Sequence, residues 1–86
     1  MQIQFNTEIW KEGSMYVVYA PQLDVSSCGK TIPEAKKNIL EAVELFLEAA
    51  ANEGTLKQIL EEAGFSFGTS WKAPKIVASE MMKLAF

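Results

Sequence analysis

The first segment of the chain, residues 2–10, alternates between two kinds of position. One face carries Ile3, Phe5, Thr7 and Ile9, and polar residues with Trp10 lie on the other. A period of two predicts a half-buried β-strand. Residues 15–20 are rich in aromatic and β-branched side chains, which favours a second strand. Residues 11–14 predict a turn in which Gly13 supplies a positive φ, so the pattern predicts a β-hairpin.

A third strand is predicted directly after the hairpin. Pro21 ends the second strand because proline has no N–H for the ladder. A short strand then fits residues 25–28 and ends at Gly29.

A long amphipathic helix is predicted over residues 32–52. Thr31 is a typical N-cap, Pro33 fits the first turn, and the Glu34 side chain can return a bond to the Thr31 N–H. Apolar residues then recur at spacings of three and four: Ala35, Ile39, Ala42, Val43, Phe46 and Ala50. Gly54 predicts a left-handed stop.

The remainder of the chain predicts a second, shorter helix and a last strand. Thr55 and Gln58 repeat the capping pattern, and Gly64 closes that helix. Residues 64–74 predict a loop. Residues 75–86 favour a strand, although residues 79–83 also fit a helix. Both parities of this strand are apolar, which is typical of a strand covered on both sides, here by a second copy of the chain.

The predicted order is therefore β-β-β-α-(α)-β in one α+β domain of residues 1–86. A chain of 86 residues has room for one core, and 49% hydrophobic residues are enough to form it. The net charge is −3, with eight lysines and no arginine. This balance argues against nucleic-acid binding by this chain alone and suits a basic protein partner.

The cysteine content and hydropathy indicate a cytoplasmic protein. Cys28 is the single cysteine, so no intramolecular disulfide is possible and a reducing compartment fits best. The sequence carries no pattern typical of a secretion signal and no apolar run of membrane-spanning length.

Catalytic chemistry is poorly supported. Without histidine there is neither an imidazole base nor an imidazole metal ligand. A metal-dependent nuclease would need carboxylates to converge, and the candidates are Glu8, Glu41, Glu44, Glu48 and Glu80. We favour the simpler interpretation that these glutamates belong to the solvated faces of the helix and the sheet, and that Cys28 is a small strand residue. We expect no enzyme, no cofactor and no metal site.

Three aromatic residues are candidate interface anchors: Trp10, Tyr16 and Trp71. Packing at the rim of the domain is the alternative for Trp10. Phe65, Phe67 and Trp71 form a second candidate patch, and the unpaired edge of the sheet is a third.

An ordered set of motifs resembles the HicB family over about residues 3–50. The set comprises Pro21-x-Leu23, then Gly29-x-Thr31-x-x-Glu34-Ala35, then Asn38-x-x-x-Ala42. The resemblance implies a partial ribonuclease-H-like fold, which consists of a three-stranded antiparallel meander, a long helix on one face and a further strand. It also implies that Gly29, Thr31 and Glu34 are fold determinants. HicB proteins are antitoxins that bind HicA toxins, which are small, basic and RNA-cleaving, and many HicB proteins form dimers or tetramers.

The sequence departs from the family at its C-terminal end. Many HicB proteins carry a DNA-binding domain there, and no residues remain for one after the last predicted strand. The resemblance implies a short antitoxin or an orphan relative that occludes a toxin by protein–protein contact. The alternatives are a homo-oligomeric structural module without a toxin and, less favoured, a metal-dependent nuclease.

Overall fold

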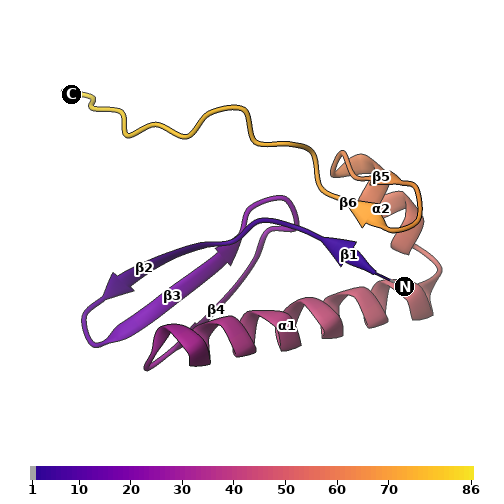
Figure 1. The fold of residues 1–86 in the computed structure, drawn as a ribbon, viewed down its shortest axis with the longest axis horizontal. Helices are drawn as coiled ribbons and strands as arrows, with labels where there is room; N and C mark the ends of the chain where they lie inside the picture. The colour runs from indigo at the N-terminus through magenta and orange to yellow at the C-terminus, as the bar shows by residue number, and fades with distance from the viewer. Residues whose placement is uncertain (1) are drawn as a thin grey trace.

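The computed structural model describes residues 2–86 as an α+β protein (Figure 1). The elements in chain order are β1 (Ile3–Gln4), β2 (Glu8–Glu12), β3 (Met15–Ala20), β4 (Val25–Gly29), α1 (Ile32–Glu53), α2 (Leu56–Glu62), β5 (Ser66–Phe67) and β6 (Trp71–Lys72). In this described part of the chain, no helix is long and apolar enough to cross a membrane.

The centre of the fold is an antiparallel sheet with strand order β2-β3-β4. The helix α1 packs on β4 and β3 and runs along one side of this sheet (Figure 1). The predicted meander with a long helix on one face is thereby confirmed. Its core lies between β3 and α1, where Val18, Ala20, Ile39 and Val43 are buried.

The β2–β3 hairpin closes on a turn of Gly13 and Ser14, with Gly13 at a φ of +58° as predicted. Lys11 pairs with Tyr16, so β2 extends further than the alternating pattern indicated. The two-residue turn suits a positive φ because it matches the twist of the flanking strands.

The single strand predicted for residues 2–10 is divided between two sheets. β1 pairs in parallel with β6, whereas β2 pairs with β3. The change of partner occurs beside Asn6, whose backbone N–H donates to Gln22 Oε1 at 3.0 Å and whose Oδ1 accepts from Gln22 Nε2 at 2.7 Å. This pair of hydrogen bonds fixes the N-terminal segment to the β3–β4 connection.

The boundaries of α1 follow the predicted capping residues. Thr31 Oγ1 accepts from the Glu34 N–H at 3.1 Å, and Gly54 ends the helix at a φ of +76°. One detail of the prediction was wrong. The Glu34 carboxylate accepts from the Lys30 N–H at 3.2 Å rather than from that of Thr31, so it orders the residue before the cap.

The segment after α1 differs more from the prediction. α2 has no side-chain cap from Thr55, whose hydroxyl instead donates to the Ala50 carbonyl at 3.3 Å. The predicted loop over residues 64–74 contains β5 and β6, which pair with each other in an antiparallel ladder. The loop prediction missed β6 because its partner, β1, lies almost 70 residues earlier in the chain.

Residues 73–86 form neither strand nor helix, so the strand predicted for residues 75–86 is wrong for the single chain. We call residues 76–86 the C-terminal arm. The arm runs away from the body of the protein toward the hairpin end of the sheet (Figure 1). All eleven of its side chains are exposed, since no other element in residues 2–86 pairs with it.

Candidate functional site

The sheet face opposite α1 carries a set of side chains that are exposed or half-buried. Side chains alternate along a strand, and Val18 and Ala20 of β3 are buried toward α1. Val17 and Tyr19 therefore point the other way. The strand register places further side chains beside them, and Asp24 joins them through its hydrogen bond to Tyr19. We call the whole set the open sheet face: Glu8, Trp10, Glu12, Met15, Val17, Tyr19, Asp24, Ser26 and Cys28.

A cross-strand row forms the centre of the open sheet face. Val17 pairs with Trp10 on one side and with Cys28 on the other. Trp10 is 41% exposed, and its indole Nε1 donates to Glu12 Oε1 at 2.8 Å. This hydrogen bond limits the indole to few orientations, so a partner that packs on it would lose little side-chain entropy on binding.

Carboxylates surround this row. Glu8 lies opposite Tyr19 in the ladder, and the Tyr19 hydroxyl donates to Asp24 Oδ1 at 2.8 Å. The hydrogen bond to Asp24 raises the pKa of Tyr19 above its ordinary value, with further contributions from desolvation and from the charges of Asp24 and Glu8. Asp24 and Glu8 therefore place two carboxylates beside the Tyr19 hydroxyl at this end of the open sheet face.

The structure separates the three aromatic residues predicted as anchors. Trp10 is exposed on the open sheet face, as expected. Tyr16 is half-buried on the α1 side of β3, with Lys11 Nζ 5.8 Å from the centre of its ring. Trp71 is buried in the core, 5.1 Å from the Phe67 ring centre, so the expectation that it is exposed was wrong.

Sequence reasoning missed Val17, Tyr19 and Asp24 as parts of this surface. Val17 and Tyr19 share a parity along β3, which was the available signal, but the strand is apolar on both parities, so the pattern does not distinguish the face that points away from the core. Asp24 adopts a φ of +54°, which brings its carboxylate back to Tyr19 across the β3–β4 turn. Nothing in the residue pattern identifies that contact.

Three residues of the family motif, Gly29, Thr31 and Glu34, lie at the corner between β4 and α1. A Cβ on Gly29 would stand 2.6 Å from the Ala35 backbone nitrogen, so the strand and the helix approach closely only because no side chain is present. Asn38 Nδ2 donates to the Cys28 carbonyl at 2.8 Å and ties the helix to the strand. Gly29, Thr31 and Glu34 therefore act on the fold and lie apart from the row of Trp10.

Within residues 2–86, no group of three or more histidine, cysteine, aspartate or glutamate residues is placed to share a metal ion. The carboxylate cluster that the nuclease hypothesis requires is therefore not found in this part of the chain. The carboxylates of the open sheet face instead form hydrogen bonds to aromatic side chains at Glu12 and Asp24. This arrangement is suited to recognition.

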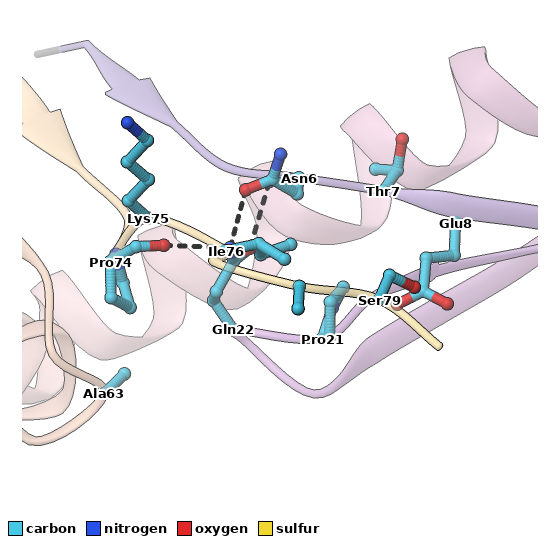
Figure 2. A pocket seen from close by; sticks show the side chains of 11 residues that line it. Asn6, Thr7, Glu8, Pro21, Gln22, Ala63, Pro74, Lys75, Ile76 and Ser79 are labelled. Carbon is cyan, nitrogen blue, oxygen red and sulfur yellow. Dashed lines mark hydrogen bonds between the residues drawn. The ribbon is translucent and has the colours of Figure 1, made fainter. Parts of the chain in front are cut away.

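A hollow of about 700 Å³, lined by both polar and apolar side chains, lies where the C-terminal arm leaves the body (Figure 2). Gln22 is central to it, because its Nε2 donates both to Asn6 Oδ1 and, at 3.4 Å, to the Pro74 carbonyl. Glu8 and Ser79 lie at the far end of the hollow (Figure 2). The root of the arm is thus held on the same side of the N-terminal segment as the open sheet face.

Comparison of the chain with family models, with curated proteins and with solved structures found no match.

Proposed function

We propose that this chain is a HicB-like antitoxin that binds a small basic HicA-type toxin and occludes its RNA-cleaving face. The observation that carries the proposal is the open sheet face, where an exposed tryptophan lies among carboxylates. The ordered motifs from Pro21 to Ala42 support it independently. The proposal includes a partial ribonuclease-H-like fold and a cytoplasmic location.

The chemistry of the open sheet face suits a basic partner. Glu8, Glu12 and Asp24 provide negative charge, which speeds the encounter with a positively charged surface and disfavours acidic competitors. Trp10 and Val17 provide apolar area at the centre, and a central aromatic residue with a polar rim is the usual anatomy of a protein interface. Occlusion needs no catalytic group in this chain, because a bound antitoxin excludes RNA by covering the toxin.

The test is light scattering coupled to size-exclusion chromatography, with the small basic protein encoded beside this chain. We expect a stable mixed complex at micromolar concentration. The variant Trp10→Ala should raise the Kd roughly 30-fold, because the complex loses an anchor worth about 2 kcal/mol. The matched control is Phe67→Ala, which removes an exposed aromatic ring outside the open sheet face and should leave the Kd within about twofold.

Two results would contradict the proposal. If no mixed complex forms, the chain does not neutralise that protein, and the homo-oligomeric module without a toxin becomes the better account. If a complex forms but Phe67→Ala weakens it more than Trp10→Ala, the toxin binds elsewhere and the open sheet face is not the site.

A further inference from the structure

The C-terminal arm presents a row of large apolar side chains to solvent. They are Ile76, Val77, Met81, Met82, Leu84 and Phe86. A contiguous apolar segment of this size marks an interaction site, because leaving it in water is unfavourable. When a segment is added to a sheet as a strand, its side chains alternate between two faces. Ile76, Met82, Leu84 and Phe86 share one parity with Ala78 and Glu80, and this parity is the more apolar of the two.

An apolar groove of matching length lies between α1 and the N-terminal segment. Two adjoining hollows of about 360 and 390 Å³ form it, and they share Ile3, Phe5 and Leu40. Lys36 and Thr7 lie at one end of the groove, and Glu48 and Ala51 lie at the other. The floor is incompletely filled, since Leu40 is 60% exposed although it faces this groove.

The groove also adjoins free backbone. β1 and β2 are edge strands in their sheets, and each pairs on one side only within residues 2–86. A sheet edge next to an apolar groove is the site at which an extended segment is added as a further strand.

The arm of the same molecule is not placed to fill the groove. Its root is held by Gln22 on one side of the N-terminal segment, beside Asn6 and Glu8. The groove lies on the other side, which Ile3 and Phe5 face. In Figure 1 the N-terminal segment runs between the arm and α1, and the arm leads away from α1.

We propose that the C-terminal arm is exchanged between two copies of this chain, each arm adding as a strand to the edge of β1 and β2 and filling the groove of the other copy. The exchange is reciprocal, so a two-fold axis relates the copies. Each copy gives eleven arm residues and an acceptor surface of similar size, which approaches the roughly 20–30 residues per side of a standard interface.

Charge and length set the direction of the exchanged arm. Glu80 is the one acidic residue of the arm, and Lys36 is the one basic residue lining the groove. With Glu80 beside Lys36, the arm to Phe86 spans about 20 Å at roughly 3.3 Å per residue. The helix from Lys36 to Ala51 spans about 22 Å at 1.5 Å per residue. Met82, Leu84 and Phe86 then follow the groove toward Leu47, antiparallel to β1.

The proposal predicts which parity of the arm enters the groove, and adjacent methionines test it. We expect the full chain to be a dimer by light scattering at micromolar concentration, with twice the chain mass of 9.5 kDa. Met82→Glu should yield monomers because residue 82 faces the groove. Met81→Glu should leave the dimer intact, since residue 81 faces outward. Both side chains are largely exposed in the single chain, so neither variant should impair folding.

A second pair of variants tests the acceptor. Leu40→Glu should yield monomers, whereas Leu45→Glu should not, because Leu45 is 67% exposed on α1 but lies outside the groove. Restoration of the dimer by combining Lys36→Glu with Glu80→Lys would support the predicted direction. A monomeric wild-type chain, or a dimer that survives both Met82→Glu and Leu40→Glu, would overturn the proposal. These readouts concern this chain alone, so they are independent of toxin binding.

Discussion

Gly29 shows how one residue holds the sheet and the helix at their observed separation. Its α-carbon lies against the first turn of α1, and an added Cβ would meet backbone atoms of Glu34 and Ala35 at 2.9 and 2.6 Å. Backbone atoms yield less readily than the end of a side chain, so the helix would have to move. The Tyr19–Asp24 hydrogen bond is a second contact between single residues, and it fixes the acidic end of the open sheet face.

The variant Gly29→Ala should lower the free energy of unfolding by about 1–3 kcal/mol, the usual cost of overpacking. Urea denaturation followed by circular dichroism measures this change. Gly68→Ala is the matched control, because a Cβ there meets open space and its φ is not in the left-handed region. Equal stability of the two variants would show that the β4–α1 corner tolerates a side chain.

The variant Asp24→Asn should lower the pKa of Tyr19 toward its ordinary value of about 10, because the carboxylate is the main cause of the raised pKa. Tyr16→Phe serves as the background for both proteins, so that Tyr19 is the only tyrosine. Absorbance of the tyrosinate during a pH titration gives the pKa. An unchanged pKa in the Asp24→Asn protein would mean that the hydrogen bond does not persist in solution.

The same shift has a defined effect on stability. A folded-state pKa above the unfolded value means that the folded protein holds the phenolic proton more tightly. The contribution of the protonated Tyr19 side chain to the free energy of unfolding is therefore fully present below a pH of about 10. It is lost as the pH rises through the folded-state pKa of Tyr19. Removal of Asp24 should reduce this loss at alkaline pH.

Individual elements could be predicted from the sequence where their signals are local. Thr31 and Gly54 identified both ends of α1, and Gly13 identified the hairpin turn, because caps and turns depend on a few adjacent residues. The division of the N-terminal strand and the existence of β6 could not be predicted, since both depend on a partner distant in sequence. The open sheet face was missed for a similar reason, because the pairing of Trp10, Val17 and Cys28 depends on strand register.

Helix capping gives a prediction at this scale. Thr31→Ala should destabilise the protein by about 1 kcal/mol, because the Glu34 N–H loses its acceptor. Thr31→Ser keeps the hydroxyl, so its loss of stability should be only a few tenths of the loss caused by Thr31→Ala. Thr55→Ala is the control at the second helix, where the hydroxyl accepts from no backbone N–H of α2, and we expect a smaller loss than for Thr31→Ala. Thermal unfolding of the three variants tests the order.

The whole molecule presents two separate surfaces on opposite sides of the N-terminal segment. The open sheet face is acidic and aromatic, and we assign it to a basic toxin. The groove beside α1 is apolar, and we assign it to the arm of a second copy. In the proposed exchange the arm of the second copy occupies the groove and not the open sheet face. The mutations that disrupt one surface should therefore leave the other unaffected.

The most direct measurement of the central claim is a titration of the toxin's RNA cleavage with this chain. The antitoxin account predicts that cleavage falls to background as this chain reaches one copy per toxin. It also predicts that Trp10→Ala shifts the titration to higher concentration, whereas Phe67→Ala follows the wild type. Undiminished cleavage at a large excess of this chain, with both proteins folded, would contradict the account.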